Sequence, residues 1–241
     1  MSQQKRNREI LTYPNPHLLK AAQRVERFDE ELSELFDEMC GLMHASDGVG
    51  LAATQVGEPI QLLVLSNYVF LPEEERKEIL DNDGDMGPNV AVINPEVIDE
   101  SSDLINDYEG CLSFPEVYIK VKRPRWVKIK AQNLQGEVIE LEGEGLGARA
   151  ILHEMDHLTG KVMTDHLGFL DRQKALKDHQ RVQKNRRLKA EREAEETSTE
   201  GEGVSARSPS RVKVGGARAR SSKHSSKARR SGNKKRNGKR R

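Results

Sequence analysis

Two histidines and a glutamate near residue 155 have the spacing of a metal-dependent hydrolytic site. The chain reads His153-Glu154-Met155-Asp156-His157. In a helix, residues four apart lie on the same face, so His153 and His157 can bind one cation while Glu154 reaches a water molecule beside it. This arrangement is typical of metal-assisted hydrolysis. Two ligands are too few for a stable site, so a third must come from elsewhere in the chain.

Cys111 is the candidate third ligand. It stands in the segment Glu109-Gly110-Cys111-Leu112-Ser113. A thiolate with two imidazoles leaves one tetrahedral position open to water, as a catalytic site requires. The alternative for Cys111 is a buried structural cysteine, and the alternative for the histidine pair is a solvated helix face. Apolar residues surround the pair and favour a buried helix, while the other histidines are isolated or lie in more polar surroundings.

A glycine-rich segment upstream is the third stretch of sequence that could take part in the chemistry. It reads Gly48-Val49-Gly50-Leu51-Ala52-Ala53-Thr54-Gln55. Its glycines allow a close approach of the backbone to a ligand, but alone the segment is equally explained as a turn before a strand. It is not a phosphate-binding loop, because no Gly-Lys-Ser/Thr follows.

Residues 48–55, 109–113 and 153–157, in this order and separation, together resemble the three signature motifs of peptide deformylases. These enzymes remove the formyl group from the N-terminal methionine of nascent proteins. The similarity extends from residue 12 to about residue 188. It implies a formylated nascent peptide as the substrate and one divalent metal ion as the cofactor, Fe²⁺ first and Zn²⁺ as the alternative, since a Cys/His/His set suits either ion.

The resemblance implies a role for each residue that matches a motif position. Three residues match the metal ligands: Cys111, His153 and His157. Glu154 matches the general acid and base, while Gln55 and the backbone N–H of Leu112 match the donors to the developing oxyanion. Gly50 matches the position whose backbone meets the formamide, and Val49 falls where the family lines its methionine pocket. Residues 72–88 lengthen the connection between motifs and residues 114–118 differ from many members, so neither stretch supplies a predicted binding residue.

The apolar pattern predicts an α+β fold in which antiparallel sheets pack around a central helix that carries the metal motif, with N- and C-terminal helices. Helical spacing predicts helices over residues 29–45, 146–158 and 171–194, the second ending at Gly160. Short apolar or alternating runs predict strands over 62–65, 90–93, 126–132 and 138–141. Residues 72–88 are acidic and are expected to form an exposed, partly helical excursion. Cys40 lies on the apolar stripe of the first helix and is expected to be a small core residue.

The charge distribution divides the chain in two. Residues 201–241 hold fifteen Lys or Arg and one acidic residue, Glu202; from totals of 40 basic and 39 acidic residues, this leaves 25 and 38 in residues 1–200. The overall charge of +1 therefore combines a body near −13 with a tail near +14. We expect a catalytic domain over 1–195 and a disordered basic tail over 196–241. Such a tail is either a solvated appendage or attracts phosphate, for which ribosomal RNA is the natural candidate.

The sequence also bears on compartment and partners. It has no run of about 18 apolar residues and no apolar stretch behind its N-terminus, so we expect a cytoplasmic protein without membrane contact, with both cysteines as free thiols. A monomer is favoured. Two other functions stay open: a zinc endopeptidase with the same His-Glu-x-x-His motif, for which His166 is the nearest downstream ligand, and a non-catalytic RNA-binding protein that keeps the fold.

Overall fold

The computed structural model describes residues 8–82 and 86–201, and the helices and strands of this part are as follows. The α-helices are α1 (Glu30–Ala45), α2 (Glu73–Asp81), α3 (Leu146–Leu158) and α4 (Phe169–Gly201). The strands are β1 (Gly50–Ala52), β2 (Leu62–Ser66), β3 (Asn89–Glu100), β4 (Leu104–Cys111), β5 (Phe114–Pro124), β6 (Trp126–Gln132) and β7 (Val138–Glu144). Short 3-10 helices are η1 (Pro16–Leu19), η2 (Ala53–Val56), η3 (Asn67–Phe70) and η4 (Met163–His166).

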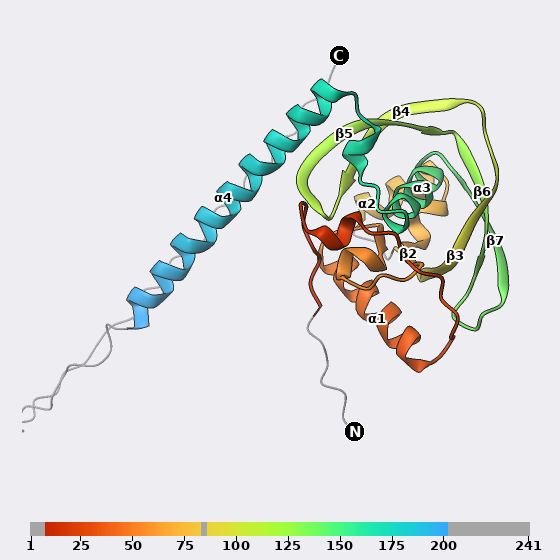
Figure 1. The fold of residues 1–241 in the computed structure, drawn as a ribbon, viewed down its shortest axis with the longest axis horizontal. Helices are drawn as coiled ribbons and strands as arrows, with labels where there is room; N and C mark the ends of the chain where they lie inside the picture. Colours follow the sequence, from red (N-terminus) through yellow and green to blue (C-terminus); the bar gives the residue numbers. More distant parts are fainter. Residues whose placement is uncertain (1–7, 83–85, 202–241) are drawn as a thin grey trace, which may run out of the picture. The chain divides into compact units, whose positions relative to one another are not determined.

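Two antiparallel sheets surround α3. One has five strands in the order β1-β2-β3-β6-β7, and the other is the two-stranded ribbon β4-β5. Helix α3 contacts β1, β2, β6 and β7 of the first sheet and β5 of the second, and Figure 1 shows it enclosed by the curving strands. The predicted α+β class with a central motif helix is therefore confirmed, and the four predicted strands are confirmed within β2, β3, β6 and β7.

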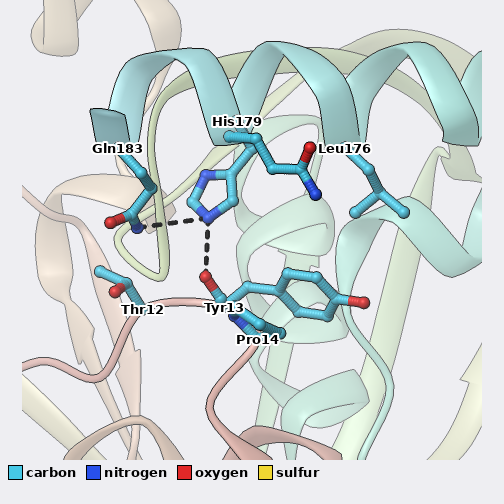
Figure 2. Close-up of a pocket in the computed structure, with 7 residues that line it drawn as sticks. Thr12, Tyr13, Pro14, Leu176, His179 and Gln183 are labelled. Atoms are coloured by element: carbon cyan, nitrogen blue, oxygen red, sulfur yellow. Dashed lines mark hydrogen bonds between the residues drawn. The ribbon is translucent and has the colours of Figure 1, made fainter. Parts of the chain in front are cut away.

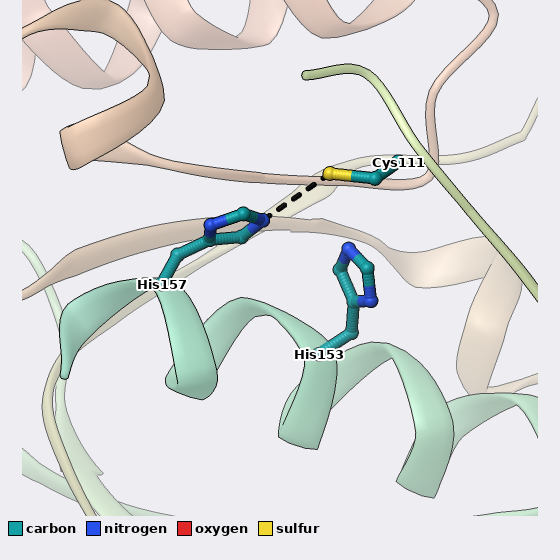
Figure 3. A group of neighbouring side chains, drawn as sticks. All are labelled: Cys111, His153 and His157. Carbon is teal, nitrogen blue, oxygen red and sulfur yellow. Dashed lines mark hydrogen bonds between the residues drawn. The ribbon is translucent and has the colours of Figure 1, made fainter. Parts of the chain in front are cut away.

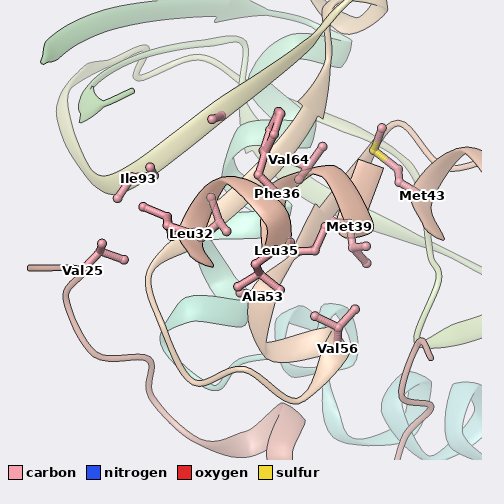
Figure 4. Close-up of a cluster of buried hydrophobic side chains, with 13 residues drawn as sticks. Val25, Leu32, Leu35, Phe36, Met39, Met43, Ala53, Val56, Val64 and Ile93 are labelled. Carbon is pink, nitrogen blue, oxygen red and sulfur yellow. The ribbon is translucent and has the colours of Figure 1, made fainter. Parts of the chain in front are cut away.

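Helix α1 covers the first hydrophobic core. Asp29 caps it by accepting a hydrogen bond from Leu32 N at 3.2 Å, and the acidic first turn suits the helix dipole. The predicted stripe is buried against β1 and β2 (Figure 4), and consists of Leu32, Leu35, Phe36, Met39 and Met43. Cys40 is partly buried beside this core, and burial raises the pKa of its thiol to about 11. The expected core role of Cys40 is consistent with both observations.

Helix α3 lies unusually close to the backbone of β7. A Cβ on Gly143 would meet the carbonyl carbon of Gly147 at 2.6 Å and the nitrogen of Ala148 at 2.8 Å. The glycine therefore allows a close approach of helix to strand that any side chain would prevent. At the other end, the chain leaves the helix through Gly160 at φ 74°, as predicted for a residue that accepts positive φ.

The ribbon β4-β5 was not predicted. In β5, buried Val117, Ile119 and Val121 alternate with exposed residues, so the period-two signal was present and overlooked. In β4 the signal is weak, because its buried residue is the carboxylate Glu109 and its exposed ones include Tyr108. When the inward-facing residue of a strand is a paired charge, the alternation of apolar and polar residues that predicts a strand is absent.

The peripheral helices differ in length from the expectations. Helix α2 confirms that residues 72–88 are partly helical. Helix α4 is longer than predicted, since it begins at Phe169 and continues to Gly201, and the contacts of the chain divide it after Ala194. The predicted disorder of the tail beyond residue 201 lies outside the described residues. Within the described part, no helix is long and apolar enough to cross a membrane.

We predict that Gly143→Ala destabilises the protein by about 1–3 kcal/mol, because the methyl group forces α3 away from β7. The matched control is Gly41→Ala, where nothing lies within 4 Å of the added Cβ. That change lies in the interior of α1 and should stabilise by about 1 kcal/mol. Urea unfolding measures both. Equal free energies of unfolding for the two variants would contradict the close packing of α3 on β7.

Candidate metal centre

The three predicted ligands converge. His153 and His157 lie on one face of α3, and Cys111 is the last residue of β4 (Figure 3). Their ligand atoms all lie within 4.8 Å of one another, and Cys111 Sγ is 3.3 Å from His157 Nε2. Both imidazoles are buried. Residues up to 46 positions apart in sequence therefore provide one compact set of a sulfur and two nitrogen donors.

Glu109 fixes the orientation of His153. Its Oε2 accepts a hydrogen bond from His153 Nδ1 at 2.9 Å, which leaves Nε2 of His153 free to bind a metal. Glu109 and Cys111 are two residues apart on β4, so their side chains leave the strand on the same side. Burial alone raises the pKa of Glu109, but hydrogen bonds from His153 and Arg123 outweigh it and hold the pKa well below its usual range.

Two buried arginines complete the charge balance around Glu109. Arg123 Nε donates to Glu109 Oε1 at 2.8 Å, and Arg149 Nη1 donates to the same oxygen at 2.9 Å. Arg149 projects from α3 and also donates to the carbonyls of Ile105 at 3.1 Å and Val121 at 2.9 Å. The motif helix is thereby joined to both strands of the β4-β5 ribbon.

Arg123 links this network to the far side of the motif. Its Nη1 donates to Asp156 Oδ2 at 2.7 Å, and the same oxygen lies 2.6 Å from His166 Nε2. Burial raises the pKa of Asp156, but its contacts with His166 and Arg123 outweigh burial and lower it. His166 is therefore a partner of Asp156 and is not in the ligand set. The downstream ligand that a zinc endopeptidase would need is not found among the described residues.

Sequence reasoning gave no role to Arg123, Arg149 or Asp156, and it considered His166 only as a downstream ligand for the endopeptidase alternative. A signal was present for Arg149, which stands between Ala148 and Ala150 in the otherwise apolar first half of α3. An arginine in such a setting needs a buried partner. For Arg123 the signal was its place in the alternation of β5, on the same side as buried Val121. Glu109 lay inside a recognised motif, but no role was given to it.

Gln55 lies beside the ligands with its amide orientation fixed. Its Oε1 accepts a hydrogen bond from Ala52 N at 2.8 Å, and its Nε2 donates to Ser113 Oγ at 3.1 Å. Nε2 also lies 3.6 Å from Cys111 Sγ. Because the carbonyl oxygen is occupied by the backbone of β1, the N–H₂ group faces the cysteine and its neighbours. The residue is 1 % exposed.

Glu154 is a buried carboxylate whose Oε2 has no hydrogen-bond partner in the described part of the chain. Burial raises its pKa to about 7, against the opposing effect of His153 and His157. A Cβ on Gly50 would meet Glu154 Oε1 at 2.6 Å, so a side chain at position 50 would displace this carboxylate. An unsatisfied buried carboxylate indicates a functional role, and a pKa near neutrality suits proton transfer.

The remaining predicted residues lie around this group. A Cβ on Gly48 would meet Leu112 Cδ1 at 2.8 Å, so the first and second motifs are in contact. Leu112 packs against the first core, and Val49 packs against the second, to which Ala150 of α3 belongs. The structure thus places all three motifs around one point. The roles of Leu112, Gly50 and Val49 toward a substrate stay predictions.

The donor set fits a divalent transition metal. One thiolate and two imidazoles are ligands that both Fe²⁺ and Zn²⁺ accept. Burial raises the pKa of the Cys111 thiol, but the positive charge of His157 and His153 outweighs it and holds the pKa well below its usual value. The thiolate is the form that binds metal. The fixed tautomer of His153 supports the same conclusion.

Comparison with known proteins agrees with this geometry. A family described as polypeptide deformylase matches residues 7–173. The chain belongs to the peptide deformylase family. A peptide deformylase of Novosphingobium aromaticivorans is 40 % identical over 185 residues, covering 73 % of this chain and 97 % of that protein. One from Campylobacter jejuni is 39 % identical over 178 residues, covering 74 % and 96 %.

Solved structures of the family have the same fold. The crystal structure of a peptide deformylase from Legionella pneumophila matches with a TM-score of 0.64 and 36 % identity, covering 76 % of this chain and 97 % of that one. The peptide deformylase from Synechococcus elongatus matches with a TM-score of 0.62 and 35 % identity, covering 73 % and 90 %. Nothing in these matches supports the endopeptidase alternative.

We predict that Glu109→Gln weakens metal affinity by roughly 10- to 100-fold, because the amide no longer holds His153 as a carboxylate does. The variant also removes the carboxylate that pairs with Arg149 and leaves Arg123 with Asp156 alone, and loss of one partner of a buried ion pair costs about 3–5 kcal/mol of stability. Competition with a chelator measures affinity, and urea unfolding of the metal-free protein measures stability. Glu116→Gln, an exposed glutamate on the same ribbon, is the control and should change neither.

The stability difference between wild type and Glu109→Gln should depend on pH with a definite sign. The folded-state pKa of Glu109 is lower than that of an unfolded glutamate, so its contribution is fully present above the unfolded value of about 4.3. It should be lost as the pH falls through the folded pKa. A difference that grows on acidification would contradict the assignment of Glu109 as a paired carboxylate.

Proposed function

We propose that Cys111, His153 and His157 bind one divalent metal ion and that Glu154, Gln55 and Leu112 act with it to remove formyl groups from nascent peptides. The family acts on the formylated N-terminal methionine and releases formate. The observation that carries the assignment of roles is the convergence of all three motifs. The ligand atoms lie within 4.8 Å of one another, beside a buried carboxylate oxygen that lacks a partner.

A bound ion supplies Lewis acidity, which acidifies water and polarises the formyl carbonyl. The rest of the chemistry falls to the side chains. Glu154 accepts the proton of the attacking water and delivers it to the nitrogen of the leaving peptide, so that the amide bond breaks into formate and a free amine. Gln55 Nε2 and the backbone N–H of Leu112 donate to the oxygen that gains negative charge in the transition state.

The backbone of the first motif positions the substrate in this proposal. Gly50 lets its backbone lie directly against Glu154, since a Cβ there would collide with the carboxylate, and this backbone would meet the formamide. Val49 lines the pocket for the methionine side chain. For the native metal we propose Fe²⁺, with Zn²⁺ as the alternative. The donor set suits either ion, and metal analysis of anaerobically purified protein decides between them.

The proposed domain boundary places a catalytic domain over residues 1–195 and a basic tail over 196–241. The division of contacts after Ala194 supports a boundary close to this point. We further propose that the protein works in the cytoplasm, where nascent chains emerge. The tail, with fifteen basic residues and one acidic residue after position 200, would bind ribosomal RNA through its phosphates without sequence preference.

We predict that Glu154→Gln retains its metal and loses kcat by roughly 100- to 10,000-fold, because the amide cannot transfer the proton. Formate release from formyl-Met-Ala-Ser measures turnover, with metal content measured on the same samples. The control is Glu142→Gln, an exposed glutamate on β7. Retained turnover in Glu154→Gln would remove this residue from the proton-transfer role. Incubation with an unformylated protein should show no internal cleavage.

Removal of the tail should abolish salt-sensitive binding to ribosomes. A 1–195 truncation is compared with the full chain by co-sedimentation across salt concentrations, because contacts with phosphate weaken steeply as salt rises. A full-length variant with the Lys and Arg residues of 223–241 changed to Gln separates charge from length. Equal co-sedimentation of all three proteins would contradict the proposal. A change in tripeptide turnover without ribosomes would instead show that the tail acts on the acidic body.

A further inference from the structure

A cavity that none of the metal ligands lines lies between α4 and the N-terminal segment (Figure 2). Its volume is about 460 Å³, and residues lining it include Thr12, Tyr13, Pro14, Leu176, His179 and Gln183. None of these residues belongs to the three motifs. The volume is within the range of small-ligand sites. The N-terminal segment forms one wall, and α4 forms the other.

The wall on the α4 side is held rigidly. His179 is 2 % exposed, and its Nε2 donates to the Tyr13 carbonyl at 2.8 Å. Its ring lies 4.8 Å from that of Phe114, centroid to centroid, and Phe114 stacks on Tyr13 at 4.9 Å. Contacts of this kind fix the cavity before a ligand arrives, which lowers the ordering cost of binding.

The lining combines apolar groups with side-chain amides and carries no Asp, Glu, Lys or Arg. Leu176, Pro14 and Tyr13 supply the apolar surface. Gln180, which also lines the cavity, makes no side-chain hydrogen bond within the described residues, and Gln183 makes one contact of 3.3 Å through its nitrogen. A primary amide donates and accepts, so it pairs best with another amide. A charged ligand would lose its hydration without gaining a counter-charge.

We propose that this cavity is a second ligand site that takes an uncharged amide bearing one aliphatic or aromatic group. The amide would bond to Gln180 and Gln183, and the apolar group would pack against Leu176 and Tyr13. Two kinds of ligand carry such an uncharged amide with an apolar group: a small molecule without free charged ends, and a peptide segment of a partner protein.

The cavity is joined to the metal centre by backbone hydrogen bonds. Tyr13 N donates to Ser113 O at 3.0 Å, and Ser113 Oγ accepts from Gln55 Nε2 at 3.1 Å. Leu11 N donates to Gln55 O at 2.8 Å. A ligand that packs against Tyr13 is therefore linked through Ser113 to the Gln55 amide. The second part of the proposal, which rests on the role proposed for Gln55, is that occupancy of the cavity alters turnover.

Titration of the full-length, metal-loaded protein tests the site directly. The probes are N-acetyl-leucinamide and the blocked peptide N-acetyl-Gly-Leu-Gly-amide, with N-acetyl-leucine as the charged control, and the readout is the NMR shift of the glutamine side-chain amides. We expect saturable shifts at Gln180 and Gln183. Binding of N-acetyl-leucine should be at least roughly tenfold weaker, because its carboxylate lacks a partner. Tighter binding of N-acetyl-leucinamide would indicate a small molecule as the natural ligand, and tighter binding of the blocked peptide would indicate a peptide segment.

Variants separate this site from the metal centre. Gln180→Ala combined with Gln183→Ala should weaken binding roughly tenfold or more. Leu176→Trp, which puts an indole ring where the apolar group of the ligand would pack, should abolish it. Gln173→Ala, an exposed glutamine on the same helix, is the control and should bind as wild type does. Saturable binding that the double variant and Leu176→Trp retain would overturn the site, as would shifts that do not saturate.

The effect on turnover is measured with formyl-Met-Ala-Ser at saturating probe. The proposal predicts a change in kcat/KM for the wild type that is absent in Leu176→Trp. Saturable binding with unchanged kcat/KM would overturn the coupling while leaving the site in place. Since the NMR titration does not depend on activity, a protein that failed to release formate would contradict the proposed function without affecting the test of this cavity.

Discussion

The carboxylate of Glu109 is the group on which the rest of the metal centre depends. It accepts from His153, Arg123 and Arg149 within 3.0 Å. These partners come from β5 and α3, while Glu109 itself lies on β4. Buried charges are stable only when paired and fully hydrogen-bonded. The network therefore holds α3 and the β4-β5 ribbon in one register, and in that register Cys111, two residues after Glu109, meets the two imidazoles.

Close backbone packing supplies the second constraint. Glycines at positions 50 and 143 let β1 and β7 approach α3 more closely than a side chain would permit. The first of these approaches brings Glu154 against the backbone of β1, and the 3-10 turn that follows brings in Gln55. The carboxylate, the amide and the ligand set are thus placed by secondary structure and not by flexible loops, which favours precise positioning of catalytic groups.

Much of this arrangement could be predicted from the sequence. The kind of sequence information that made a residue predictable differs from one residue to the next. The spacing of His153 and His157 is a local property of a helix, so the pair and its buried face were predictable. Cys111 and Gln55 are far from the pair in sequence, and only the resemblance of ordered motifs connected them. Arg123 and Arg149 were not identified, although both stand at positions whose neighbours indicate burial, because the sequence does not show which distant carboxylate pairs with them. The strand β4 was not predicted, because its inward-facing residue is the charged Glu109 and not an apolar one. The contact of His179 with Tyr13 joins residues 166 positions apart, and no local rule predicts it.

We propose that one sulfur and two imidazole nitrogens of this chain bind the catalytic ion. X-ray absorption spectroscopy of the anaerobically purified, metal-loaded protein measures the ligand atoms directly. We predict one sulfur and two imidazoles in the coordination shell of the wild type, and no sulfur in Cys111→Asp. A wild-type shell without sulfur, or a shell that Cys111→Asp leaves unchanged, would contradict the account.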